Sequence, residues 1–254
     1  MDRTVITSAW LDQIRWSDGW DVLKGTHEID HPSVWVIDPA TTHLQLTDQY
    51  EDILSTEEIA LGNRFHQAGH VIRYKTAHAA LRLLLSSSTT IDPIAIRFAK
   101  GHHHKPRLLP NHPGNTAEFN LSYSENKAMI GMANGLPVGV DIEWLHRPLA
   151  INDMLSACFS EREIAFITSP NEDMYRRFYT LWTRKEAVLK LTGEGIGEHL
   201  PYFEVLDGTC VAEKKIIGGH PPGAIFLYSF PIGNDFLGCF AVPNPIDELY
   251  CYRL

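Results

Sequence analysis

Hydrophobic positions recur along the chain in two patterns, one with helical spacing and one with the spacing of β-strands. Apolar residues fall at intervals of three and four over 71–85 and over 174–191, which predicts a helix in each segment. Short apolar runs bounded by turn residues predict strands at 34–37, 43–46, 94–98, 119–122, 128–132, 138–143, 203–206, 225–230, 236–242 and 248–252. Because strands flank both helices, we predict an α+β fold.

The order of these elements is repeated within the chain. The sequence Ser-Thr-Glu-Glu-Ile-Ala that begins at Ser55 resembles Ser-Glu-Arg-Glu-Ile-Ala beginning at Ser160, an offset of 160 − 55 = 105 residues. Each Ser-x-x-Glu unit is a capping box, which predicts the start of a short helix before each long one. We therefore predict a duplication with similar subdomains at 1–137 and 138–254, joined at a hinge near Pro137.

Composition limits the classes of function. The 254 residues are 44% hydrophobic and 21% charged, as in globular proteins, and the formal net charge of −9 argues against nucleic-acid binding through a basic face. Four widely spaced cysteines form no CxxC pair, and we interpret them as reduced thiols of a cytoplasmic protein. No secretory signal or membrane-spanning apolar run is visible, so we expect no membrane partner.

Two short acidic motifs carry the strongest chemical signal. In the predicted strand Gly-Val-Asp-Ile-Glu, Asp141 and Glu143 project from one face and suit a hard cation such as Mg²⁺. In the predicted helix, Glu186 and Lys190 share a face. Each motif alone also has an ordinary interpretation. The first is then a solvated acidic strand face, and the second is an intrahelical ion pair that contributes a few tenths of a kcal/mol.

Several polar residues are candidates for binding phosphate. Arg73 can form a bidentate pair with phosphate, or it can face solvent as an ordinary helix residue. Lys105 precedes Pro106, which constrains the loop. Ser122 lies near the end of a predicted strand, where its hydroxyl can hydrogen-bond phosphate or can simply belong to a polar turn. The histidines at 102–104 point in divergent directions, so at most two share a metal or phosphate site.

Five motifs in this order resemble the 4′-phosphopantetheinyl transferases, specifically the double-length, surfactin-synthetase-activating type. The motifs are Lys105-Pro106, Phe119-Asn120-Leu121-Ser122-Tyr123-Ser124, Gly139–Glu143, Phe159-Ser160-x-x-Glu163 and Trp182-x-x-Lys185-Glu186-Ala187-x-x-Lys190. The resemblance extends from about Arg64 to Gly195. It implies a pseudo-twofold pair of α+β subdomains with the active site in the cleft between them. It also implies a monomer, because a duplicated chain carries both halves of the site.

The resemblance implies transfer of the 4′-phosphopantetheine arm of coenzyme A to a serine of an apo acyl or peptidyl carrier protein, with release of 3′,5′-ADP. It implies that Asp141, Glu143 and Glu186 bind Mg²⁺, with Mn²⁺ as the alternative cation. Glu186 is also the implied base, directly or through a metal-bound water, and Lys190 stabilises or protonates the departing 3′,5′-ADP. The residues matching positions that hold the coenzyme A phosphates and adenine are Arg73, Lys105, Pro106, Ser122 and Tyr123.

One residue departs from the family pattern. Tyr123 stands where the family usually has histidine, and a phenol donates one hydrogen bond but does not become a cation near neutral pH. Two other functions therefore stay open at this point. One is a non-catalytic protein that binds coenzyme A or a carrier, and the other is a metal-dependent hydrolase of coenzyme A or a phosphodiester.

Carrier proteins are generally acidic, so docking on this acidic chain requires a local basic or apolar patch. We predict that patch near the second-half helices, with apolar contacts from 149–166 and basic contacts from Arg162, Arg176, Arg177 and Arg184. The pathway that the carrier serves, whether fatty acid, polyketide or nonribosomal peptide synthesis, is not encoded in these motifs.

Overall fold

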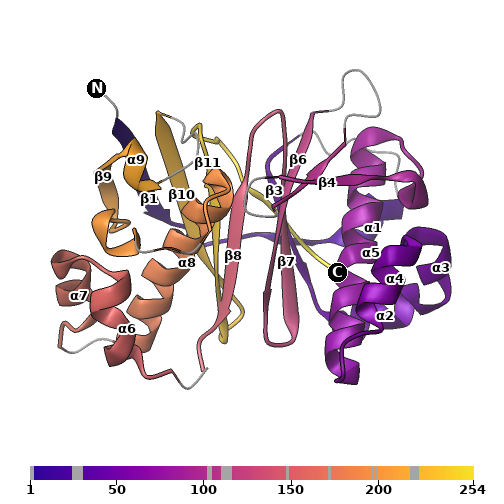
Figure 1. Ribbon diagram of the computed structural model, residues 1–254, viewed down its shortest axis with the longest axis horizontal. Coiled ribbons are helices and arrows are strands. Elements are labelled where there is room, and N and C mark those ends of the chain that lie inside the picture. Colours follow the sequence, from indigo (N-terminus) through magenta and orange to yellow (C-terminus); the bar gives the residue numbers. More distant parts are fainter. Residues whose placement is uncertain are drawn as a thin grey trace. The chain divides into compact units, whose positions relative to one another are not determined.

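The computed structural model describes residues 3–24, 31–101, 105–109, 116–146, 149–170, 173–195, 197, 199–217 and 223–254; the predicted contacts of the histidines at 102–104 lie outside these ranges. The chain forms two compact units (Figure 1). The first contains Met1–Ile14, Gly101–Lys105 and Pro137–Asp247, and the second contains Arg15–Lys100, Pro106–Leu136 and Glu248–Leu254. The chain passes from the second unit to the first at 136–137, and each unit also includes a chain terminus that the division into 1–137 and 138–254 would assign to the other.

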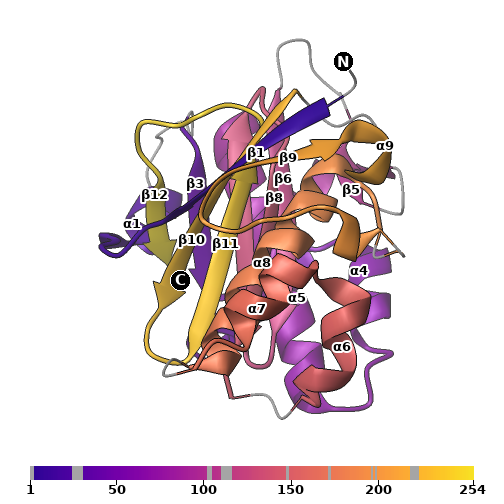
Figure 2. The same cartoon turned by 90° about the vertical axis from the view of Figure 1, so that its left-hand side faces the viewer.

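The first unit is a twisted sheet covered by helices. Its strand order is β8-β11-β10-β1-β9, antiparallel except for the parallel pair β1–β10. Helix α8 packs along β8, β11 and β10, and Figure 2 shows it in front of β11. The elements are β1 (Arg3–Trp10), β8 (Gly139–Trp144), α6 (Ile151–Cys158), α7 (Glu161–Ile167), α8 (Met174–Thr192), η4 (Leu200–Tyr202), β9 (Gly208–Glu213), α9 (Lys214–Ile217), β10 (Ala224–Ile232) and β11 (Phe236–Val242).

The second unit has the sheet order β2-β12-β3-β7-β6 and a small sheet of β4 and β5. Its long helix α5 packs against β6 and β7. In the described part of the chain, no helix is long and apolar enough to cross a membrane. The elements are β2 (Trp16–Asp18), α1 (Gly19–Lys24), β3 (Ser33–Ile37), α2 (Pro39–Leu46), η1 (Thr47–Gln49), α3 (Tyr50–Ile53), α4 (Thr56–Gly62), α5 (Ala68–Thr89), η2 (Pro93–Ala95), β4 (Phe98–Lys100), β5 (Pro106–Leu108), β6 (Ala117–Ser124), β7 (Lys127–Asn134) and β12 (Tyr250–Arg253).

The two units repeat one succession of elements, which confirms the predicted α+β pair. In the second unit β3, α4, α5, β6 and β7 follow one another, and in the first unit β8, α7, α8, β10 and β11 do the same. The strand orders β3-β7-β6 and β8-β11-β10 also correspond, with antiparallel pairing throughout. Both predicted capping boxes are present, at Ser55–Glu58 and Ser160–Glu163.

The capping-box glutamates do more than close a helix end, because each also binds a cation of the following long helix. Glu58 accepts from Arg82 Nε at 2.6 Å and is hydrogen-bonded to His78 at 3.2 Å. Glu163 pairs with Lys185 at 2.8 Å, and both side chains of that pair are fully buried. Each box therefore ties a short helix to the long helix that packs on the sheet.

Three predicted strands were wrong in whole or in part. Residues 43–46 belong to helix α2, which Asp38 caps and Pro39 starts at the first helical position. Residues 94–98 form the 3₁₀ helix η2 and only the start of β4. Residues 203–206 form no strand, because the amide of Val205 donates to the Glu163 carboxylate rather than to a neighbouring strand.

Helix α8 approaches strand β8 so closely that one position of the strand tolerates no side chain. A Cβ at Gly139 would overlap the carbonyl oxygen of Ala187 and would lie 2.9 Å from the Cα of Leu191. Both of those groups are backbone and cannot move aside as a flexible side chain would. Gly139 therefore sets the distance between β8 and α8, the two elements that carry the acidic motifs.

We expect Gly139→Ala to lower the free energy of unfolding by about 3 kcal/mol, because the methyl group forces strand and helix apart. Urea denaturation followed by circular dichroism measures this change. Gly69→Ala is the matched control, because a Cβ at Gly69 in α5 meets nothing within 4 Å. Equal stability of the Gly139→Ala and wild-type proteins would contradict the close packing.

The Glu58 carboxyl makes stability depend on pH. Burial alone raises its pKa, but hydrogen bonds from His78 and the Ser55 amide and the charge of Arg82 outweigh burial and hold the pKa at about 2. The ionised form thus stabilises the fold above the ordinary glutamate pKa, and this contribution disappears as pH falls towards 2. We expect Glu58→Gln to cost about 2 kcal/mol at pH 7 and progressively less below pH 4. Urea denaturation at a series of pH values measures the cost at pH 7 and its decrease at low pH, with the exposed Glu51→Gln as control. A cost independent of pH would refute the assignment of a low pKa to Glu58.

Candidate functional site

The acidic motifs meet where β8 packs on α8. Asp141 lies two residues beyond Gly139 on the same face of β8, is 4% exposed, and accepts a hydrogen bond from Lys190 Nζ at 2.6 Å. Glu143, the next residue on that face, accepts from Trp182 Nε1 at 3.2 Å. Strand and helix run in opposite directions, so successive residues of the strand face meet successive turns of α8.

Glu186 lies on α8 between the turns of Trp182 and Lys190. Its side chain is buried, and its Oε1 atom has no hydrogen-bond partner within the described ranges. Burial and then the charge of Asp141 raise the pKa of Glu186 to about 7, with Glu143 adding to the rise and Lys190 opposing it. Burial, together with repulsion from Asp141 and Glu143, thus favours the protonated form of Glu186 below neutral pH.

This arrangement is not an assembled metal centre. Across the residues that the structure describes, no three His, Cys, Asp or Glu side chains are gathered as ligands of one ion. The donor set nevertheless suits Mg²⁺, which in proteins usually takes only one or two carboxylates together with water and substrate phosphate. A divalent cation would give the Oε1 atom of Glu186 a partner and would offset the repulsion among the carboxylates. Bound there, it would lower the pKa of Glu186 again.

Lys105 reaches the same strand and helix from outside the acidic face. Its ammonium donates to the carbonyl of Val138 at 2.9 Å and to that of Leu191 at 3.4 Å, so it bridges the start of β8 and the end of α8. The predicted contact of Lys105 with coenzyme A stays a prediction. The observed hydrogen bonds show a structural role that the sequence did not suggest.

Arg73 and Tyr123 meet in the second unit. The guanidinium carbon of Arg73 lies 5.6 Å from the centre of the Tyr123 ring, and Nη1 donates to the carbonyl of Glu125. Tyr123 and Ser122 are neighbours on β6, so their side chains point to opposite faces of the sheet. Tyr123 packs with the cluster that includes Leu81 of α5, whereas the side chain of Ser122 faces away from α5 and is buried.

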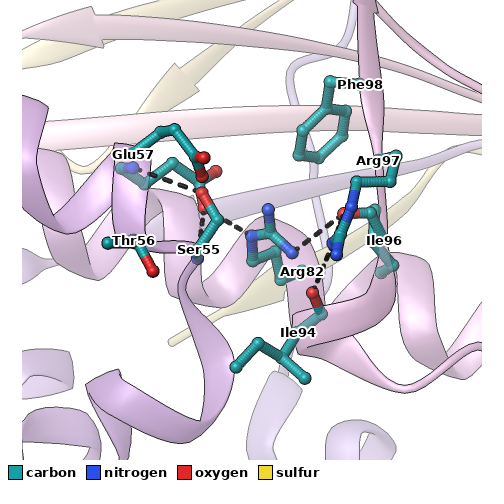
Figure 3. Close-up of a pocket in the computed structure, with 9 residues that line it drawn as sticks. Ser55, Thr56, Glu57, Arg82, Ile94, Ile96, Arg97 and Phe98 are labelled. Carbon is teal, nitrogen blue, oxygen red and sulfur yellow. Dashed lines mark hydrogen bonds and ion pairs between the residues drawn. The ribbon is translucent and has the colours of Figure 1, made fainter.

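A pocket lies elsewhere in the second unit. It has a volume of about 550 Å³ and surrounds Arg82, which donates to Glu58 and to the carbonyl of Ile96 (Figure 3). Arg82 also donates to the carbonyl of Pro93. None of the predicted site residues lines it, and Pro106 is exposed on β5 away from its lining. Its polar groups bind one another, so the pocket serves as a junction between α4, α5 and β4.

The predicted carrier-docking patch needs correction. Arg177 and Arg184 are buried, the first donating to the carbonyl of Ile167 and the second pairing with Asp207 at 2.6 Å. Arg162 and Arg176 are exposed. Of the apolar residues in 149–166, several are buried in the core, including Ile151, Leu155 and Phe159. The positions follow the helical period of α8, in which Arg177, Leu181 and Arg184 share an inward face.

Sequence reasoning also missed the partners that orient the acidic groups. Trp182 belongs to one of the five motifs, but the motif does not show that its indole donates to Glu143. A tryptophan and a carboxylate on adjoining elements give no sequence signal until strand and helix are paired. The sequence also gave no role for Gly139, although the close approach of another backbone is a common reason for glycine in a strand.

Comparison with known proteins places these residues in a family. The model of the 4′-phosphopantetheinyl transferase superfamily matches residues 137–228, a range that contains Asp141, Glu143, Glu186 and Lys190. The 4′-phosphopantetheinyl transferase HetI of Nostoc sp. is 31% identical over 66% of this chain and 71% of its own length. Of two Bacillus subtilis enzymes, ffp is 29% identical over 78% of this chain and 87% of its own, and Sfp is 27% identical over 78% and 86%.

Among solved structures, a holo-(acyl-carrier-protein) synthase from Bacillus anthracis, in complex with CoA (3′,5′-ADP), matches 40% of this chain and 92% of its own with a TM-score of 0.32 and 13% identity. The sequence relationships and the acidic groups on β8 and α8 agree with the motifs quoted at the outset. The chain belongs to the 4′-phosphopantetheinyl transferase superfamily.

Proposed function

We propose that this transferase moves the 4′-phosphopantetheine arm of coenzyme A to a serine hydroxyl of an apo carrier protein, in a Mg²⁺-dependent reaction that releases 3′,5′-ADP. The observation that carries the proposal is the cluster formed by the buried Asp141 and Glu186, the half-buried Glu143 and Lys190, inside the segment matched to the superfamily. The names of the relatives, all 4′-phosphopantetheinyl transferases, support the same reaction.

The reaction exchanges one phosphorus–oxygen bond for another. The serine oxygen of the carrier bonds to the phosphorus that bears the pantetheine, and the bridging bond to 3′,5′-ADP breaks. Glu186 takes the serine proton, and Lys190 stabilises the negative oxygen of the leaving group. Asp141, Glu143 and Glu186 would hold the Mg²⁺, which would neutralise charge that builds up on the diphosphate.

Hydrogen bonds hold two of the three carboxylates in fixed orientations. Trp182 fixes the carboxylate of Glu143, and Lys190 fixes that of Asp141 while carrying the positive charge needed beside a diphosphate. Such preorganisation provides most of the catalysis in phosphoryl transfer, because the protein contributes little covalent chemistry. Contacts of Arg73, Lys105, Pro106 and Ser122 with the coenzyme A phosphates and adenine are part of the proposal, and Tyr123 lies beside Arg73.

Incubation with a panel of apo carrier proteins, coenzyme A and Mg²⁺ tests the reaction, with intact-protein mass spectrometry as the readout. We expect a mass gain equal to the phosphopantetheine arm on at least one carrier, and loss of that gain when a chelator removes the cation. Binding of coenzyme A without mass gain would favour a non-catalytic binding protein. Release of 3′,5′-ADP without any carrier would favour a hydrolase.

The variant Glu186→Gln tests the role of the central carboxylate. We expect turnover to fall by at least about 100-fold, because the variant loses both a cation ligand and the base. The fold should persist with an unchanged or higher melting temperature, since the substitution removes a buried charge that repels its neighbours. Glu161→Gln on the exposed start of α7 is the matched control and should stay active. Full activity of Glu186→Gln would refute the assigned role.

A further inference from the structure

Tyr123 presents the face of its ring to Arg73 rather than its hydroxyl to solvent. The guanidinium carbon lies 5.6 Å from the ring centre, a distance at which a cation is attracted to an aromatic face. The hydroxyl oxygen is buried and has no hydrogen-bond partner within the described part of the chain. A phenol that donates a hydrogen bond to a bound anion must direct its hydroxyl towards that anion. The hydroxyl of Tyr123 is instead buried within the unit.

The surroundings of the hydroxyl keep it neutral. Burial raises the pKa of Tyr123 well above its ordinary value, and the nearby Tyr74 and Glu58 raise it further, while Arg73 lowers it. Tyr123 packs against the hydrophobic cluster beneath α5. The ring is therefore held in place by packing, which is what a platform for another side chain requires.

Arg73 is held on its second side by the hairpin between β6 and β7. Its Nη1 donates to the carbonyl of Glu125, a residue whose φ of 46° lies in the left-handed region that favours glycine. The carbonyl is neutral and leaves the arginine charge uncompensated. Among the described residues, no carboxylate pairs with Arg73, and a guanidinium has further N–H donors to offer an anion.

We propose that Tyr123 is a positioning residue whose ring, together with the Glu125 carbonyl, holds the Arg73 guanidinium ready for a phosphate group of the co-substrate, and that its hydroxyl takes no part in binding. The inference rests on the proposed function, because it names coenzyme A as the source of the phosphate. It gives the tyrosine that replaces the usual family histidine a different task. The charge comes from Arg73, and the aromatic residue supplies orientation.

Three substitutions at position 123 separate ring from hydroxyl. Tyr123→Phe keeps the ring and should leave the KM for coenzyme A, the dissociation constant and kcat unchanged. Tyr123→Leu removes the ring face and should raise the KM and the dissociation constant about three- to tenfold, with kcat within about twofold. Tyr123→Met is the second ring-free variant if Tyr123→Leu does not fold, as judged by its melting curve.

A cycle with Arg73→Gln shows whether the ring acts through the arginine. Arg73→Gln should weaken coenzyme A binding, and Tyr123→Leu should add no further loss in that background. Arg15→Gln is the matched control, because it removes an exposed arginine of the same unit that the proposal does not involve, so affinity should not change. An equal loss for Tyr123→Phe and Tyr123→Leu, or a full additional loss in the Arg73→Gln background, would overturn the proposal.

Direct calorimetric titration distinguishes failure of this inference from failure of the proposed function. If the wild type binds coenzyme A but transfers nothing, the proposed transfer reaction is wrong. The dissociation constants of the wild type and the variants at positions 73 and 123 still decide the role of Tyr123. If the wild type binds no coenzyme A, the variants are titrated with inorganic pyrophosphate. The pattern given for coenzyme A would then support positioning for a phosphate anion, and no binding of either probe would overturn it.

Discussion

The close contact between β8 and α8 is the constraint on which the rest of the site depends. Gly139 lets the two backbones approach, and this approach places Asp141 and Glu143 against the turns of Trp182, Glu186 and Lys190. Carboxylates so close and so buried disfavour full ionisation, as the raised pKa of Glu186 shows. Apolar packing along the rest of α8 stabilises the unit against this repulsion. The fully buried Lys185–Glu163 pair also ties α8 to α7.

The duplication shows how such a site arises from an ordinary scaffold. In the second unit the strand face that packs on α5 carries Trp35 and Ile37, which belong to the hydrophobic core together with Leu81. In the first unit the corresponding face of β8 carries Asp141 and Glu143. The strand orders and the capping boxes are the same in both, so the scaffold does not depend on those side chains. The same scaffold therefore carries core residues on this face in one unit and carboxylates in the other.

The sequence predicted the long helices, the capping boxes and most of the strands, because each of these follows from local periodicity or from a local hydrogen-bond motif. It failed where a distant partner decides the structure. The apolar alternation at 43–46 is helical because Asp38 and Pro39 start a helix there, and the amide of Val205 is taken by the distant Glu163. β1 was missed because its pairing with β9 and β10 joins residues about 200 positions apart.

For the candidate site, residue types were predictable and their relations were not. Spacing alone put Asp141 beside Glu143 and Glu186 beside Lys190. It could not show that Lys190 pairs with Asp141, because that pair joins two elements 49 residues apart. The buried arginines Arg177 and Arg184 were misjudged for the same reason, since burial of a charged side chain depends on partners that sequence spacing does not reveal.

Each unit carries a group whose charge calls for a ligand of opposite charge. The three carboxylates and Lys190 sum to −3 + 1 = −2 when all are ionised, which matches one divalent cation. Arg73, set between the Tyr123 ring and a neutral carbonyl, has the opposite requirement, namely an anion. In the proposed reaction, Mg²⁺ would meet the first requirement and a phosphate of coenzyme A the second. A neutral tyrosine at position 123 is compatible with that proposal, because the positive charge comes from its neighbour Arg73.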